Sequence, residues 1–163
     1  MRLNFFFLLV SPPEEIMEYV SSKKKLVKEL IGHNYESFQS KAHLTLHQYF
    51  DFHNESLLYT FSERISQIKS FTIHVADFKM FPNNGTIYLN AFALELDELA
   101  KRLRNKSFTP HITIAKKLNP QDLNLTWQAF KSLHYKNTFP CKSVTVLKRT
   151  DDRWQPHMNL PLG

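Results

Sequence analysis

Ala42-His43-Leu44-Thr45-Leu46 is a short stretch of alternating character that the chain repeats as Pro110-His111-Ile112-Thr113-Ile114. Each copy reads histidine, aliphatic residue, threonine, aliphatic residue. Side chains of a β-strand point alternately to its two faces, so each copy predicts a strand with histidine and threonine on one face and aliphatic residues on the other. Two matched copies therefore predict two strands that each offer an imidazole and a hydroxyl on a rigid apolar support.

The sequence around the two motifs alternates between strand and helix patterns. Gly32 is a plausible helix stop, and Ser11 a plausible N-cap followed by Pro12 at the first helical position. Asn84-Gly85 supplies the positive φ angles of a tight hairpin between two strands. The spacing predicts helices at 12–31, 55–68, 94–105 and 119–133, and strands at 2–10, 42–50, 71–81, 86–92, 110–115, 144–147 and 154–160. This order predicts an α+β fold with helices on the outer faces of sheet.

Composition limits the classes of protein that the chain can represent. Its 163 residues are 42% hydrophobic, with 3 glycines and 8 prolines, which favours one packed domain over residues 1–163 rather than units joined by long linkers. The single cysteine, Cys141, cannot form a disulfide within the chain. A formal net charge of +6 favours an anionic partner.

The apolar run at residues 5–10 raises the question of a targeting segment. It is short and is followed by Ser11-Pro12-Pro13-Glu14-Glu15 rather than by a small-residue cleavage site, so we interpret it as a buried strand. No stretch has the length of a transmembrane helix. We therefore expect a cytoplasmic protein without a membrane partner.

The paired motifs and their surroundings resemble the two-histidine (2H) phosphoesterase superfamily, whose bacterial members include RNA 2′,3′-cyclic phosphodiesterases, also called 2′-5′ RNA ligases. The likeness extends over essentially the whole chain and includes the opening strand before Pro12-Pro13-Glu14 and the segment 108–116. The resemblance implies two pseudo-symmetric lobes of antiparallel or mixed sheet with outer helices, and an active-site groove between them. The family often has arginine two residues beyond the first threonine, where this chain has His47.

The residues of the motifs suit the opening of a cyclic phosphodiester. That reaction needs a base to deprotonate water and an acid to protonate the departing sugar oxygen, and histidine serves in both roles near neutral pH. We predict catalytic roles for His43 and His111, with His111 assigned as base and His43 as acid. The hydroxyls of Thr45 and Thr113 would hydrogen-bond the phosphate oxygens. The scheme requires no metal and no cofactor.

A metal site is the alternative use of these histidines. His43 and His47 have a spacing that suits shared ligation on a helix, but on a strand it separates them by roughly 13 Å, too far to bind one zinc ion. A site assembled across both lobes remains the other possibility. Few carboxylates or thiols accompany the two strands, so we predict no metal.

Six further residues are candidates for substrate binding. His47 would share the face of His43 and Thr45, and either reach the substrate or line the mouth of the groove. Lys116 follows the second motif and would meet phosphate or serve as a surface residue. Tyr49, Tyr88, Phe5 and Phe7 would stack on a nucleobase, with core packing as the favoured alternative for each phenylalanine.

The sequence thus predicts a monomeric, metal-independent phosphoesterase that hydrolyses 2′,3′-cyclic or 2′-5′ phosphodiesters at RNA or nucleotide ends. Two alternatives stay open. One is a cyclic phosphodiesterase for small nucleotides resembling a cyclic phosphate of ADP-ribose. The other is a non-catalytic RNA-binding module on the same fold, although simple binding would favour lysine and arginine at the motif positions.

Overall fold

A computed structural model describes residues 4–51, 55–104, 108–150 and 152–163, without the side chains of Asn4, Tyr49, Phe50, Asp51 and Arg104. The helices are α1 (Glu14–Ile31), α2 (Ser56–Ile65), α3 (Leu94–Arg104) and α4 (Pro120–Phe130), with a short 3-10 turn at Pro82–Asn84. The strands are β1 (Asn4–Val10), β2 (Leu44–Asp51), β3 (Phe71–Phe81), β4 (Thr86–Phe92), β5 (His111–Ala115), β6 (Lys136–Cys141), β7 (Ser143–Thr150) and β8 (Arg153–Pro161).

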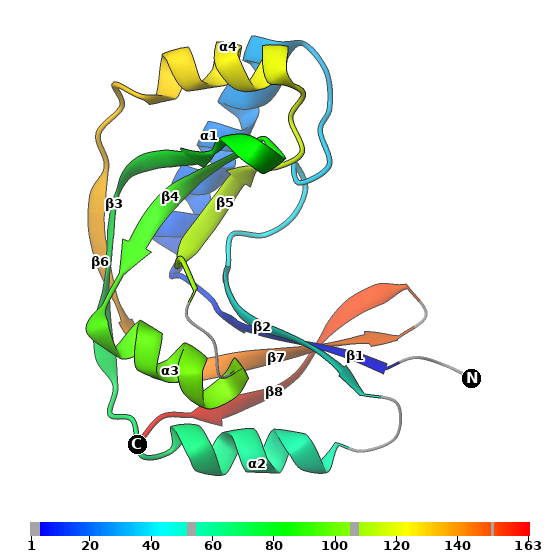
Figure 1. Cartoon of the computed structure of the whole chain (residues 1–163), viewed down its shortest axis with the longest axis vertical. Helices are drawn as coiled ribbons and strands as arrows, with labels where there is room; N and C mark the ends of the chain where they lie inside the picture. The colour runs from blue at the N-terminus through cyan, green and yellow to red at the C-terminus, as the bar shows by residue number, and fades with distance from the viewer. Residues whose placement is uncertain (1–3, 52–54, 105–107, 151) are drawn as a thin grey trace.

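The described strands form one antiparallel sheet in the order β6-β3-β4-β5-β2-β1-β7-β8. The middle of this order is the contact between β5 and β2, the strands that carry the second and first motifs. On either side of it lie four strands, which splay apart into an upper and a lower layer in Figure 1. The predicted two-lobed α+β fold is confirmed: one lobe contains β6, β3, β4 and β5, and the other contains β2, β1, β7 and β8.

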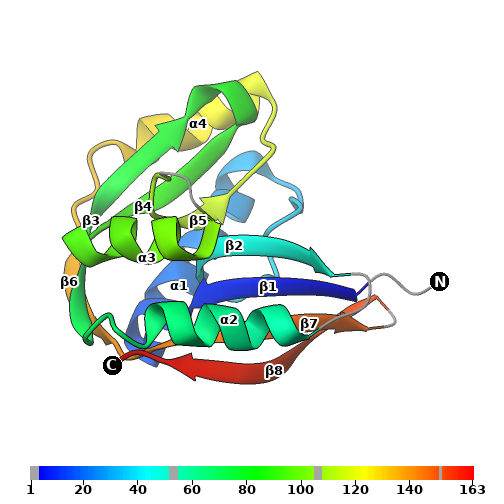
Figure 2. The same ribbon diagram turned by 60° about the horizontal axis from the view of Figure 1, so that its bottom comes forward.

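Helices cover the lobes in a crossed arrangement. The helix after β1 is α1, yet it contacts β5 and α4, while α4 contacts β4. The helix after β4 is α3, yet it contacts β2 and α2, while α2 contacts β8. Figures 1 and 2 show α1 and α4 on the β3–β4–β5 lobe, and α2 and α3 on the β1–β2–β7–β8 lobe. Each lobe is thus covered by one helix that follows a strand of the other.

The apolar residues of both motifs lie in the hydrophobic core. Leu44, Leu46, Ile112 and Ile114 are fully buried, as the alternation of the motifs predicts. They belong to a continuous cluster that includes buried residues of all four helices. Close packing of this kind restricts movement of the motif strands, so the polar side chains on their other face have a rigid base.

The β3–β4 hairpin is confirmed with the predicted bounds. Of Asn84 and Gly85, both expected to have positive φ angles, only Gly85 does, with a φ of 65°, while Asn84 ends the 3-10 turn. Glycine adopts this left-handed conformation without strain. Its carbonyl accepts a hydrogen bond from the Leu118 amide at 3.1 Å, and a Cβ added to Gly85 would collide with the backbone of Leu118. The turn therefore ties the segment after the second motif to the hairpin beside it.

The start of α1 and the strand β6 differ from what the sequence predicts. The N-cap of α1 is Pro13, and the helix begins at Glu14, so Ser11 and Pro12 precede it. The strand β6 was not predicted, because its sequence is polar and contains Pro140. Proline cannot donate to a ladder of hydrogen bonds but is tolerated at the edge of a sheet, which is where β6 lies.

Candidate active site

The two His-x-Thr motifs lie side by side at the centre of the sheet. Leu44 of β2 pairs directly with Ile112 of β5 in antiparallel register. Continuing this register by one residue on each side places His43 opposite Thr113 and Thr45 opposite His111. Directly opposed residues project to the same face, so the four polar side chains share the face opposite Leu44 and Ile112. The pairing thus brings together two imidazoles and two hydroxyls.

Each imidazole is held by the backbone two residues before it. Nδ1 of His43 lies 2.7 Å from the carbonyl oxygen of Lys41, and Nδ1 of His111 lies 2.7 Å from the carbonyl oxygen of Thr109. A carbonyl oxygen only accepts, so Nδ1 of each ring carries a hydrogen and donates it. This leaves Nε2 as the nitrogen of each ring that is not engaged with that backbone carbonyl.

Each motif strand also has an irregularity directly after its threonine. In the β1–β2 pairing, Leu9 faces Thr45 and Leu8 faces His47, so Leu46 is an extra residue. In the β4–β5 pairing, Tyr88 faces Thr113 and Ile87 faces Ala115, so Ile114 is the extra residue. A bulge of this kind shifts the alternation of side chains beyond it. The equivalent bulges extend the likeness of the two motifs to their backbones.

The bulge corrects the prediction that His47 shares the face of His43 and Thr45. Beyond Leu46 the alternation is reversed, and His47 pairs with Leu8, a fully buried core residue. Its ring contacts Phe61 of α2 edge to face, with ring centroids 6.0 Å apart. His47 therefore lies on the helix side of the sheet, away from the two motif histidines. Tyr49 pairs with the buried Phe6, but its side chain lies outside the described part of the structure.

Aromatic rings support both histidines. The ring of Phe7 in β1 contacts His43 at a centroid distance of 5.7 Å. His111 contacts Tyr88 at 5.4 Å and Phe81 at 5.3 Å, and these two rings stack on each other at 4.2 Å. Tyr88 thus contacts the ring of His111, but it is buried, and this burial raises the pKa of its hydroxyl.

A buried lysine braces the loop that leads into the first motif. Lys24 of α1 is only 3% exposed, and its ammonium donates to the carbonyl oxygens of Ser37 and Ser40 at 2.8 and 2.7 Å and to the Ser40 hydroxyl at 3.0 Å. These bonds use all three donors of the ammonium. The hydroxyl of Ser37 in turn accepts the Lys116 amide at 3.2 Å, just after the second motif. We refer to Lys24, Ser37 and Ser40 as the Lys24 clamp.

The clamp was not predicted from the sequence, where Lys24 belongs to the run Lys23-Lys24-Lys25 and resembles a solvated helix face. Two signals distinguish it in the folded chain: its burial and its three oxygen partners from one loop. Burial lowers the pKa of Lys24 to about 8, with a further contribution from the charge of Lys116. Three acceptors around the ammonium compensate for part of that burial.

The two histidines differ in their electrostatic surroundings. The pKa of His43 is lowered, first by burial and then by the positive charges of Lys24, Lys116 and His111, while its bond to Lys41 opposes the shift. The contribution of His111 reflects the proximity of the two rings, since charges act on each other over short distances in a protein. Lys116 is exposed and adds positive charge near His43, which fits the predicted contact with an anionic substrate.

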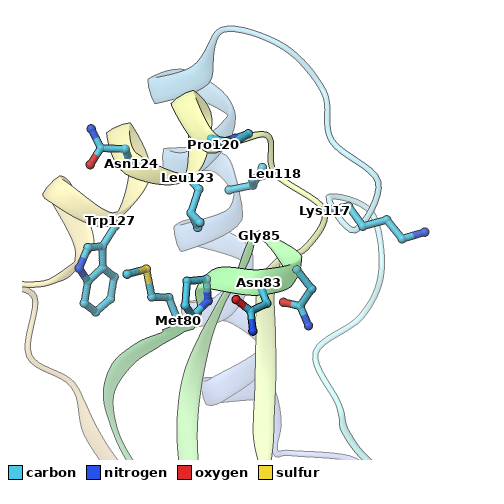
Figure 3. Close-up of a pocket in the computed structure, with 11 residues that line it drawn as sticks. Met80, Asn83, Gly85, Lys117, Leu118, Pro120, Leu123, Asn124 and Trp127 are labelled. Atoms are coloured by element: carbon cyan, nitrogen blue, oxygen red, sulfur yellow. The ribbon is translucent and has the colours of Figure 1, made fainter.

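Two surface pockets lie away from the motifs. One has a volume of about 520 Å³ and is lined by Glu63, Arg64, Gln67 and Arg102 of α2, α3 and the turn after α2. The other, of about 440 Å³, lies between the tip of the β3–β4 hairpin and α4, where Met80, Asn83, Lys117 and Trp127 surround it (Figure 3). Neither lining includes a motif residue.

Neither a cluster of metal ligands nor a helix able to cross a membrane occurs in the described part of the chain. Within residues 4–51, 55–104, 108–150 and 152–163, no three or more His, Cys, Asp or Glu side chains are grouped so that they could hold a metal ion. Across the same described residues, no helix combines the length and the apolar character needed to cross a membrane.

Comparison with known proteins gives one family and a set of similar folds. A model of the 2′-5′ RNA ligase superfamily matches residues 12–153. The structure of E. coli LigT complexed with 3′-AMP has a TM-score of 0.73 and 20% sequence identity over 99% of both chains. LigT complexed with phosphate has a TM-score of 0.72 and 19% identity, again over 99% of both chains. The protein TT0787 of Thermus thermophilus has a TM-score of 0.68 and 18% identity over 96% of this chain and 97% of that one. No curated protein sequence gives a significant match.

Proposed function

The chain belongs to the 2′-5′ RNA ligase superfamily, and on this premise we propose that it hydrolyses 2′,3′-cyclic or 2′-5′ phosphodiesters at the ends of RNA or nucleotides. Members of this family are phosphoesterase- or ligase-type enzymes. We propose that the reaction uses the two histidines His43 and His111 as its general acid–base pair, without a metal ion.

The observation that carries this proposal is the matched pair of imidazoles. Both histidines donate from Nδ1 to a backbone carbonyl, and both lie on one face of neighbouring paired strands. A phosphodiester between them would meet one Nε2 on each side. One imidazole takes a proton from water, the water oxygen bonds to phosphorus, and the bond from phosphorus to the sugar oxygen breaks. The other imidazole gives its proton to that departing oxygen.

The charges around His43 bear on how the two roles are divided. Its lowered pKa favours the neutral imidazole at neutral pH, which is the form that a general base needs. A proton on His111 would lower the pKa of His43 further, because like charges oppose each other. We therefore propose that His43 is the base and His111 the acid, the reverse of the assignment made from the sequence.

The remaining polar groups of the site have proposed roles toward the phosphate. The hydroxyls of Thr45 and Thr113 would donate to its non-bridging oxygens and hold it in line for attack. The exposed ammonium of Lys116 would attract the anion, since it already acts on His43 through its charge. Solved structures of E. coli LigT hold 3′-AMP and phosphate, which carry the anionic phosphate group that the proposed substrates share.

A panel of substrates in the presence of excess chelator tests the proposal. The panel contains the four nucleoside 2′,3′-cyclic phosphates, an RNA with a 2′,3′-cyclic end, a 2′-5′ dinucleotide and a small cyclic phosphate of ADP-ribose. We expect turnover of cyclic or 2′-5′ phosphodiesters that chelator does not reduce. Turnover that is lost with chelator and restored by zinc or manganese would contradict the mechanism. Binding of RNA without any turnover would support the non-catalytic alternative.

A further inference from the structure

We propose that Phe7, Arg149 and Trp154 form a stacking subsite for the nucleobase of the substrate, beside His43. We call these three residues the Trp154 platform. The inference rests on the proposed function and deepens it, because it selects substrates that carry a base over a bare sugar phosphate.

The platform lies on the same face of the sheet as the motif histidines. Phe5 of β1 pairs with Arg149 of β7, and Arg149 pairs with Trp154 of β8, so these three side chains project to one face. Phe7 lies two residues after Phe5 in the same strand and shares that face. Its ring contact with His43 identifies the face as that of the candidate active site.

Ring contacts connect the platform to the catalytic pair. The Phe7 ring contacts both His43 and Trp154. Its centroid lies 5.7 Å from that of His43 and 5.4 Å from that of Trp154. Base and phosphate of one nucleotide are separated only by its ribose. When the phosphate is bound at His43, the nucleobase of the same nucleotide is therefore within reach of the Trp154 indole, which contacts Phe7.

The chemistry of the platform suits a nucleobase. Trp154 keeps 40% of its surface exposed, so part of the indole is accessible to a ligand on this face. The guanidinium carbon of Arg149 lies 6.0 Å from the centroids of both Trp154 and Phe5, and its Nη2 donates to Asp152 at 3.1 Å. Indole rings and guanidinium planes are the side chains on which bases stack, largely independently of base identity.

The other lobe offers an exposed aromatic residue on this face for comparison. Phe92 of β4 is 48% exposed and lies two residues beyond Asn90, which pairs with His111. Its ring is already stacked on His74 at 5.2 Å and 13°, so one of its faces is covered. Trp154 meets Phe7 at a tilt of 54° and has the cation of Arg149 beside it, which favours the platform as the base subsite.

Kinetic measurements on substrates with and without a nucleobase test the inference. The substrates are adenosine 2′,3′-cyclic phosphate and the 2,3-cyclic phosphate of methyl riboside, which has the same ribose but no base. For Trp154→Ala we expect KM for the adenosine substrate to rise about tenfold or more, in the range of a lost stacking contact, with little change in kcat. KM for the methyl riboside should change less than about twofold. Trp154→Phe should recover most of the loss, because it keeps an aromatic face.

Phe92→Ala is the matched control, as an exposed aromatic residue on the same face of the other lobe. We expect it to leave the ratio of the two KM values unchanged. The inference is overturned if Phe92→Ala changes this ratio and Trp154→Ala does not. It is also overturned if Trp154→Ala weakens both substrates equally, which would indicate a structural role.

A binding measurement separates failure of the inference from failure of the proposed function. Calorimetry compares 3′-AMP with ribose 3-phosphate on the wild-type protein and on Trp154→Ala. If the protein turns over neither cyclic phosphate, the proposed function fails, but preferential binding of 3′-AMP that Trp154→Ala removes still supports the platform. Equal affinity of the wild-type protein for 3′-AMP and ribose 3-phosphate overturns it.

Discussion

The two motif regions have the same backbone and different surroundings. Both histidines bond to a carbonyl two residues earlier, both threonines precede a bulge, and Leu44 and Ile112 pair at the centre. Around His43, however, lie the positive charges of Lys24 and Lys116, whereas His111 lies against the stacked rings of Tyr88 and Phe81. The repeated backbone positions the two imidazoles alike, and the neighbouring charges lower the pKa of His43.

The largest effect should come from removing either imidazole. We expect His43→Ala and His111→Ala each to lower kcat/KM for a nucleoside 2′,3′-cyclic phosphate by about 100-fold or more, the usual contribution of a general acid or base. The double variant should be little worse than either single one, because the two groups act as a unit. A loss below tenfold for either variant would show that the two motifs are not equivalent partners in catalysis.

A substrate with an activated leaving group then separates the two roles. Such a leaving group departs without a proton, so it needs the base but hardly the acid. With His111 as the acid, His111→Ala should be largely rescued on this substrate and His43→Ala should not. The opposite pattern would restore the assignment made from the sequence.

The next largest effect should come from the Lys24 clamp, whose lysine braces the loop before the first motif. Lys24→Met removes the charge near His43 and leaves the Ser37 and Ser40 carbonyls without their donor, so the loop before His43 should loosen. We expect kcat/KM to fall about tenfold, since loss of positioning is costly, and the pKa of His43 to rise in NMR titration. Lys25→Met, an exposed lysine of the same helix, is the control. An unchanged His43 titration in Lys24→Met would limit the clamp to a structural role.

A smaller loss is expected when a threonine hydroxyl is removed and its shape is kept. Thr45→Val and Thr113→Val each delete one proposed phosphate contact, and a single oxygen contact contributes less than an acid or a base. We expect losses of a few-fold to about tenfold in kcat/KM, similar for the two variants. A much larger loss at one position would mean that the phosphate binds closer to that motif.

The lowered pKa of His43 also predicts how folding stability depends on pH. The folded-state pKa lies below the ordinary value of about 6.5, so the unfolded chain binds this proton more readily. Stability contributed by His43 is therefore fully present above about 6.5 and is lost as the pH falls through the folded-state pKa. Urea unfolding of the wild type and of His43→Gln across this range should show a shallower acid decline for the variant. Parallel declines would show that His43 does not contribute.

The smallest effect is expected at His47, the equivalent in β2 of the buried Ala115 in β5. Because His47 contacts Phe61 on the helix side of the sheet, His47→Ala should change kcat/KM less than about twofold, as expected for a group outside the substrate contacts. It should mainly lower the free energy of unfolding, by about 1 kcal/mol for the lost packing. A loss of activity comparable with that of His43→Ala would contradict the reversed alternation after the bulge.

Structural features that depend on local periodicity could be predicted from the sequence. Alternation in the two motifs places Leu44 and Ile112 in the core and the histidines opposite them, and Asn84-Gly85 marks the hairpin. These predictions hold because a period of two residues and a positive φ angle are properties of adjacent residues. The roles of His43, His111 and their threonines remain predictions that await the kinetics.

Features that depend on distant residues could not be predicted in this way. The bulge after Thr45 is a property of the pairing with β1, and it reversed the face of His47. Lys24 is distinguished from its neighbouring lysines only by oxygens 13 to 16 residues away. Trp154 gains its place beside Phe7 through the β1–β7–β8 pairing, which joins the two ends of the chain.

The crossed helices have a consequence for how the chain folds as it is synthesised. The helix α1 is complete at Ile31, but β5, against which it packs, begins only at His111. The apolar side of α1 therefore lacks β5 as its packing partner, and stays exposed or loosely covered, until most of the chain has left the ribosome. Contacts so distant in sequence slow folding. We expect neither half of the chain to fold by itself, and chaperones to encounter α1 before its permanent partner strand exists.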